Sequence, residues 1–169
     1  VHLGDGEEKV YNLFKEHVAR HNSNWVSPEF WGFVAGTGSP YGMLTEMLLS
    51  AINHGSMIHT HIAKQSLSWI KEMLEYPLNA GSVFVSGGSE ANFTGLAVAR
   101  NMKAEIDAKK DGVQMAPRKM TLYCSEETHG CLDRSVELLG LGNDALRWIK
   151  TDDSCKIVIK SLKESIKKD

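Results

Sequence analysis

The sequence predicts an α/β fold with a parallel sheet, preceded by N-terminal helices, because apolar residues change their spacing after Gly81. Short apolar runs typical of buried strands occupy residues 82–85, 120–124 and 146–150. Apolar residues at helical spacing follow these runs, over residues 90–105, 130–139 and 154–167. Strands separated by helices of this length form right-handed crossovers, which place the strands parallel in one sheet. The candidate N-caps of the last helix are Asp152, Asp153 and Ser154.

The chain before Gly81 shows helical periodicity without strand-like runs. Three segments carry apolar residues at intervals of three and four positions, over residues 7–21, 43–53 and 63–75. Aromatic residues, glycines and prolines crowd residues 25–42, a composition typical of an irregular loop that fills a core or lines a pocket. We therefore divide the chain into residues 1–80, with the helices and this loop, and residues 81–169, with the first part of an α/β domain.

Composition excludes several classes of protein. The 169 residues are 42% hydrophobic and 24% charged, as in a soluble globular protein, and the net charge of −2 argues against a nucleic-acid partner. Apolar runs fall far short of the roughly 20 residues that a membrane helix needs, and VHLGDGEEKV is no secretory signal, so we expect a cytoplasmic protein without a membrane partner. Cys124, Cys131 and Cys155 form no CxxC pair, which favours reduced thiols.

The turn Gly87-Gly88-Ser89 lies between a predicted strand and a predicted helix. Glycines let a ligand approach the backbone amides, the first helical turn offers free N–H groups, and Ser89 adds a hydroxyl. These features predict an anion site suited to a phosphate. The motif is neither a Walker A loop nor GxGxxG, and the same residues also suit an ordinary strand-to-helix turn that Ser89 caps.

His129 follows the second predicted strand, immediately before a helix that begins near Gly130. Taken alone, a histidine in such a loop is more often a solvated or capping residue than a functional one. However, loops at the carboxyl ends of neighbouring parallel strands converge on one ligand crevice, so we expect His129 and the Gly87-Gly88-Ser89 turn to face the same site. A phosphate site beside an imidazole indicates a phosphorylated aromatic cofactor that stacks on the histidine.

Several ordered motifs resemble the group II pyridoxal-phosphate-dependent amino-acid decarboxylases, which include the aromatic amino-acid and glutamate decarboxylases. They are SGGSEAN, YCSEETHGCLDRSVELLG, PEFWGFVAGTGSPYGMLTEMLLSAIN and SLSWIKEMLEYP, and the resemblance covers residues 25–169. It implies a fold-type I, transferase-like α/β large domain, here truncated at its C-terminal side. The cofactor implied is pyridoxal 5'-phosphate, and the reaction implied is decarboxylation of an L-amino acid to the amine and carbon dioxide.

The resemblance also assigns residues. Gly87, Gly88 and Ser89 correspond to the phosphate-binding turn, and His129 to the residue that stacks on the pyridine ring. Phe33, Val34 and Thr37 lie in the loop that borders the substrate side chain. Members of the family form homodimers in which the N-terminal helices wrap the partner, so we expect a homodimer. The sequence leaves open which amino acid is the substrate.

Two residues that the family requires are expected beyond Asp169. They are the lysine that forms the Schiff base with the cofactor and the aspartate that pairs with the pyridine nitrogen. No lysine in this chain follows a histidine, and neither Asp107-Ala108 nor Asp144-Ala145 continues into a second alanine. We therefore expect residues 1–169 to hold no catalytic lysine and to be inactive alone.

The sequence leaves three other interpretations open. Another fold-type I enzyme, an aminotransferase or lyase, would share the phosphate turn and the stacking residue. A non-catalytic binding module would explain the missing lysine but would leave an exposed strand edge. A metal site could use His54, His59 and His61, with the last two on one side of an extended segment, but no cysteine or carboxylate follows at a familiar spacing, so we expect no metal.

Overall fold

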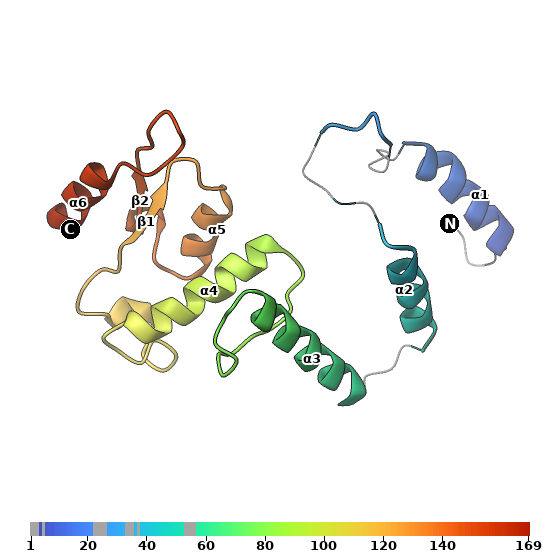
Figure 1. Ribbon diagram of the computed structural model, residues 1–169, viewed down its shortest axis with the longest axis horizontal. Helices are drawn as coiled ribbons and strands as arrows, with labels where there is room; N and C mark the ends of the chain where they lie inside the picture. Colours follow the sequence, from blue (N-terminus) through green and yellow to red (C-terminus); the bar gives the residue numbers. More distant parts are fainter. Residues whose placement is uncertain (1–3, 5, 22–26, 33–35, 37, 53–56) are drawn as a thin grey trace. The chain divides into compact units, whose positions relative to one another are not determined.

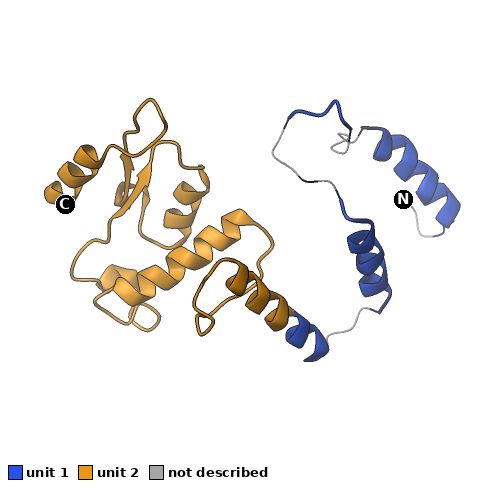
Figure 2. Ribbon diagram, viewed as in Figure 1, with its two compact units in different colours: residues 1–62 blue, residues 63–169 orange. Residues whose placement is uncertain are grey.

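A computed structural model describes residues 4, 6–21, 27–32, 36, 38–52 and 57–169 (Figure 1). The chain separates into two compact units, Val1–Ile62 and Ala63–Asp169, which Figure 2 colours differently. The predicted division into residues 1–80 and 81–169 separates the N-terminal helices from the α/β domain, and it stays a prediction.

The first unit contains two helices that the apolar periodicity predicted. Helix α1 (Glu7–His17) carries acidic residues in its first turn and basic residues in its last, which complements the helix dipole, and the 3₁₀ turn η1 (Ala19–His21) follows it. Helix α2 (Pro40–Ile52) begins with a proline, whose missing N–H costs nothing there. Ser39 precedes this helix, and its hydroxyl accepts a hydrogen bond from the Gly42 amide at 3.3 Å.

Helix α3 (Met57–Met73) begins six residues before the predicted start at residue 63. It ends in a Schellman motif, in which Tyr76 N donates to Lys71 O at 2.8 Å and Glu75 N donates to Glu72 O at 3.1 Å. Glu75 takes the left-handed conformation at φ 52°, a position that usually holds glycine. In the described part of the chain, no helix is both long and apolar enough to cross a membrane.

The second unit has the predicted α/β order. Its elements are α4 (Gly88–Lys103), η2 (Val113–Met115), β1 (Leu122–Ser125), α5 (Cys131–Leu138), η3 (Asn143–Ala145), β2 (Leu146–Ile149) and α6 (Ile159–Lys168). Strands β1 and β2 pair in parallel, with Leu122 opposite Leu146 and Ser125 opposite Ile149. The predictions of a parallel sheet and of a helical crossover through α5 are therefore confirmed for this pair of strands.

The core of the second unit lies where α5 packs against the two strands. Val136 is fully buried and clusters with Cys124 of β1 and Leu146 of β2. Partly buried leucines surround this cluster, namely Leu122, Leu132 and Leu141. Each such apolar side chain contributes about 1.5–3 kcal/mol when it is fully removed from water, so this cluster fixes α5 on the sheet.

The predicted strand at residues 82–85 is wrong for the described structure. These residues form no strand, and the side chains of Val83 and Phe84 are 63% and 54% exposed. A strand exists only when a neighbouring strand takes up its backbone N–H and C=O groups. Within the described residues, β1 and β2 pair with each other, and nothing pairs with this segment.

The predicted start of the last helix at residue 154 is also wrong. Helix α6 begins at Ile159, and Asp152 closes a turn before it by accepting the amides of Ser154 at 2.9 Å and Lys156 at 3.0 Å. An antiparallel bridge between Thr151 and Ile157 continues this turn. An aspartate that accepts amides two and four residues ahead can close a turn as readily as it caps a helix, which explains the error.

Candidate functional site

The Gly-Gly-Ser turn forms the start of α4. Gly87 precedes the helix in an extended conformation, and its carbonyl accepts the Ala91 amide at 3.0 Å. The amides of Gly88, Ser89 and Glu90 lie in the first turn and therefore have no intrahelical acceptor. Free N–H groups at the positive end of the helix dipole favour an anion at this position.

The two glycines leave open space in front of these amides. A Cβ atom built on Gly87 or Gly88 would meet no atom within 4 Å. Gly87 has an extended φ of 177° and Gly88 is the first residue of the helix, so the backbone conformation does not require glycine at either position. The residues present fit a phosphate, because a ligand can approach the amides without meeting side chains.

Glu90 reinforces the turn from within the same helix, a role that the sequence analysis missed. Its Oε2 accepts hydrogen bonds from the Ser86 amide at 2.9 Å and from the Ser86 hydroxyl at 2.6 Å. The Ser86 hydroxyl and amide lower the pKa of the Glu90 carboxyl. The signal in the sequence was a serine four residues before a first-turn glutamate, an arrangement close to a capping box.

His129 has a fixed ring at the start of α5. Its Nδ1 accepts a hydrogen bond from the Cys131 amide at 3.1 Å, so the neutral ring carries its proton on Nε2. The bond satisfies one of the unpaired amides of the first turn of α5. His129 is therefore a capping residue, as one of the two alternatives predicted. The hydrogen bond uses only Nδ1, so the exposed ring is still available to a ligand.

Ser89 and His129 line one open cavity of about 540 Å³. Its lining comes from α4, from α5 and from the residues just before α5, namely Ser89, Glu90, Phe93, His129, Gly130, Cys131, Arg134, Ser135 and Leu138. The turn at the start of α4 and His129 therefore face one cavity, although residues 82–85, which lead into that turn, form no strand of the sheet. The roles of Gly87, Gly88, Ser89 and His129 toward a cofactor stay predictions.

Two hydrogen bonds join α4 to α5 at opposite ends. Near the cavity, Asn92 Nδ2 donates to Cys131 Sγ at 3.2 Å. At the far end, Arg100 Nη1 donates to the carbonyl of Leu139 at 3.0 Å. Neither contact can be predicted from the sequence pattern, because each joins residues 39 positions apart.

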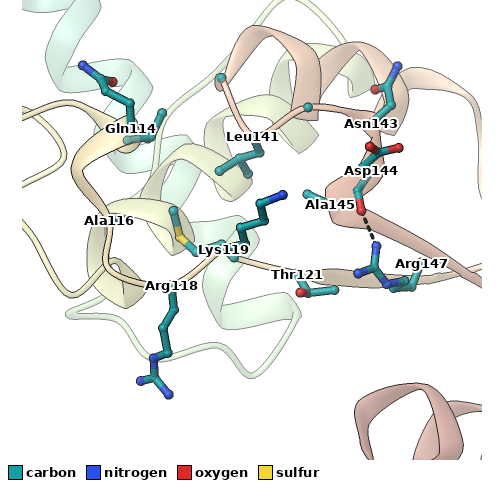
Figure 3. A pocket seen from close by; sticks show the side chains of 14 residues that line it. Gln114, Ala116, Arg118, Lys119, Thr121, Leu141, Asn143, Asp144, Ala145 and Arg147 are labelled. Carbon is teal, nitrogen blue, oxygen red and sulfur yellow. Dashed lines mark hydrogen bonds between the residues drawn. The ribbon is translucent and has the colours of Figure 1, made fainter. Parts of the chain in front are cut away.

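A larger cavity of about 720 Å³ lies at the other edge of the sheet, beside the residues that precede β1 and β2. Lys119 points into it in Figure 3, while the guanidinium of Arg147 binds the Asp144 carbonyl. It includes none of the predicted site residues. Because ligands of parallel α/β sheets bind at the carboxyl ends of strands, the cavity with Ser89 and His129 is the candidate functional site.

Other predicted residues are not brought to this site. Phe33, Val34 and Thr37, and also His54, lie outside the described residues. His59 and His61 lie in helix α3, not in an extended segment, and residues two apart on a helix do not share a face. Among the described residues, no three side chains of histidine, cysteine, aspartate or glutamate gather as a metal site would require.

Comparison with known proteins identifies the family. The family model described as "Pyridoxal-dependent decarboxylase conserved domain" matches residues 3–169, so the chain belongs to this family, whose cofactor is pyridoxal 5'-phosphate. An aromatic-L-amino-acid decarboxylase of Bacillus atrophaeus is 30% identical over 172 residues, which cover 98% of this chain and 34% of that protein. A 4-hydroxyphenylacetaldehyde synthase of Rhodiola rosea is 25% identical and covers 98% of this chain and 36% of its own length.

Solved structures show the same fold. The glutamate decarboxylase domain of a diaminobutyrate-pyruvate transaminase and L-2,4-diaminobutyrate decarboxylase from Vibrio parahaemolyticus matches with a TM-score of 0.85 at 20% identity. The match covers 99% of this chain and 39% of that one. The fold-type I prediction is therefore confirmed, and the chain spans about a third of the length of the curated relatives described above.

Proposed function

We propose that this chain forms the phosphate-binding and ring-stacking part of a pyridoxal-phosphate-dependent enzyme that decarboxylates an L-amino acid to the amine and carbon dioxide. The observation that carries the proposal is the single cavity that both Ser89 and His129 line. Family membership supports the cofactor, and a relative named as an aromatic-L-amino-acid decarboxylase supports the reaction.

The residues of the cavity would divide the work of holding the cofactor. The amides of Gly88, Ser89 and Glu90, together with the Ser89 hydroxyl, would bind the phosphate, and Gly87 keeps the approach open. The His129 ring, held by the Cys131 amide, would lie against the pyridine ring. When bound, the cofactor supplies an electron sink for the charge that departing carbon dioxide leaves behind.

The substrate side of the site and the covalent attachment belong to the same proposal. Phe33, Val34 and Thr37 would border the substrate side chain, as in the family. The Schiff-base lysine and the aspartate for the pyridine nitrogen would follow Asp169, so residues 1–169 alone would be inactive. The relatives' greater length supports this arrangement.

We further propose that the enzyme is a cytoplasmic homodimer in which the N-terminal helices contact the partner. Helix α2 supports dimerisation, because most of its large apolar side chains are exposed, namely Met43, Leu44, Met47, Leu48, Leu49 and Ile52. Burial of such an apolar surface against a second subunit would stabilise the dimer.

A second candidate reaction is formation of an aldehyde from an aromatic amino acid. The relative from Rhodiola rosea, named as a 4-hydroxyphenylacetaldehyde synthase, favours it. Both reactions release carbon dioxide, so the organic product distinguishes them. The enzyme, expressed from its complete gene, should be incubated with aromatic and acidic L-amino acids, and the amine and aldehyde should be separated by chromatography.

The decisive experiment replaces His129 with alanine in that enzyme. We expect His129→Ala to raise the dissociation constant for pyridoxal 5'-phosphate about two- to tenfold and to slow carbon dioxide release, because a stacked aromatic pair contributes about 0.5–1.5 kcal/mol. His17→Ala, an exposed histidine of α1, is the matched control and should change neither quantity. Unchanged affinity and rate in His129→Ala would remove His129 from the site.

A further inference from the structure

Cys131 links the two loops that the candidate site needs. Its thiol accepts Asn92 of α4 at 3.2 Å, and its backbone amide donates to the His129 ring at 3.1 Å. A third bond holds the residue itself, since the Ser135 hydroxyl donates to the Cys131 carbonyl at 2.8 Å. Cys131 is 7% exposed, so these contacts form at the edge of the core and not in free solvent.

Asn92 determines which side of α4 faces α5. It lies three residues after Ser89, so the two side chains occupy the same face of the helix. Each residue of an α-helix turns the chain by about 100°, and a rotation of α4 by one residue would carry Ser89 away from the cavity. The bond from Asn92 to Cys131 opposes that rotation at the end of the helix where the phosphate turn lies.

The contact at the far end of the helices cannot do this alone. Arg100 holds the Leu139 carbonyl three turns along α4, and its long side chain can keep that bond while the helix rotates slightly. The short side chains of Asn92 and Cys131 allow much less movement. The two contacts therefore provide a natural comparison between general packing of the helices and positioning of the site.

We propose that Asn92 and Cys131 are a positioning pair that fixes the phosphate-binding turn at the start of α4 relative to the His129 ring at the start of α5. The inference rests on the proposed function, in which the start of α4 binds the phosphate of the cofactor and His129 contacts its ring. Neither residue takes part in the reaction; Asn92 acts through Ser89 and Cys131 acts through His129.

The test uses five variants of the enzyme expressed from its complete gene: Asn92→Ala, Cys131→Ala, Cys131→Ser, the double variant Asn92→Ala/Cys131→Ala, and Arg100→Ala. Three quantities are measured for each. They are the dissociation constant for pyridoxal 5'-phosphate by fluorescence titration, the visible circular dichroism of the bound cofactor, and the thermal midpoint of the cofactor-free protein. The circular dichroism reports how the ring is held, which general loss of stability would not change.

We expect Asn92→Ala and Cys131→Ala each to raise the dissociation constant about three- to tenfold, the effect of one hydrogen bond, and to reduce the circular dichroism of the bound ring. The double variant should be no worse than either single variant, because each removes the same bond. Cys131→Ser keeps an acceptor and should stay within about twofold of wild type. Arg100→Ala should lower the thermal midpoint and leave the affinity and the circular dichroism unchanged.

Two results would overturn the positioning pair alone. One is wild-type affinity and circular dichroism in Asn92→Ala and Cys131→Ala, with only the thermal midpoint lowered, as in Arg100→Ala. The other is a double variant whose loss of affinity is the sum of the single losses. If the wild-type enzyme itself binds no pyridoxal 5'-phosphate, the proposed function fails and the positioning pair fails with it.

Discussion

Residues 63–169 and residues 1–62 differ in what they bury. Every buried residue of the described structure lies in the second region, between Cys124 and Ile149. The first region has no buried residue among those that the structure describes, although most residues of α2 are apolar. Leu146 of β2 is 6% exposed, whereas Leu48 of α2 is 63% exposed.

The difference shows that apolar periodicity and a core are separate properties. Helical spacing is enough to align apolar side chains on one face, as in α1 and α2. Burial requires a second surface, and in residues 63–169 the strand-helix-strand unit β1-α5-β2 supplies one between Leu122 and Ile149. The candidate site is built on the region that completes its own core.

The largest expected effect comes from leucine-to-alanine changes in the two regions of the polypeptide 1–169. Leu146→Ala should lower the free energy of unfolding by about 2–5 kcal/mol, because it leaves a cavity in the core. Leu48→Ala, its matched control, should change it by less than about 0.5 kcal/mol in the monomeric polypeptide, because that side chain is exposed when no second subunit covers α2. Urea unfolding measures both. Similar losses in the two variants would show that the two regions do not differ in burial.

A smaller effect is expected at the start of α4, where hydrogen bonds from Ser86 change the pKa of Glu90. The Ser86 hydroxyl and amide lower the pKa of Glu90, so the hydrogen bonds that Glu90 accepts are fully present above its ordinary value of 4.5 and weaken as the pH falls through the lowered pKa. Ser86→Ala removes the larger cause and should move the pKa of Glu90 up toward 4.5. NMR titration of the glutamate carboxyl carbons measures this pKa.

The control for that titration lies in the first region. Ser39→Ala removes the serine hydroxyl that precedes α2 and should leave the pKa of Glu90 where it is in wild type. If Ser86→Ala also left it unchanged, the hydrogen bond from the Ser86 hydroxyl would not exist in solution.

The smallest expected effect concerns the end of α3, the helix that spans the boundary between the regions. Glu75→Gly should raise the free energy of unfolding by up to about 1 kcal/mol, because glycine adopts the left-handed φ without steric cost. Glu72→Gly, within the helix, should lower it by about 1 kcal/mol instead. Urea unfolding compares the two. Losses of the same size in both variants would mean that Glu75 is not strained.

The sequence by itself determined the presence and order of the helices, the parallel pair β1 and β2, and the position of the Gly87-Gly88-Ser89 turn at a helix start. These depend on residues that are close together in the chain, such as the apolar spacing within α5 and the glycines at a helix start. The family resemblance also came from local motifs, and the match over residues 3–169 confirmed it.

Tertiary structure decided what depends on distant neighbours. Residues 82–85 have the composition of a strand, but a strand needs a partner to take up its backbone hydrogen bonds. His59 and His61 alternate as in an extended segment, yet the helix extends back to Met57 and separates them. The contact between Asn92 and Cys131 joins residues 39 apart, and only the packing of α4 against α5 could bring that amide to that thiol.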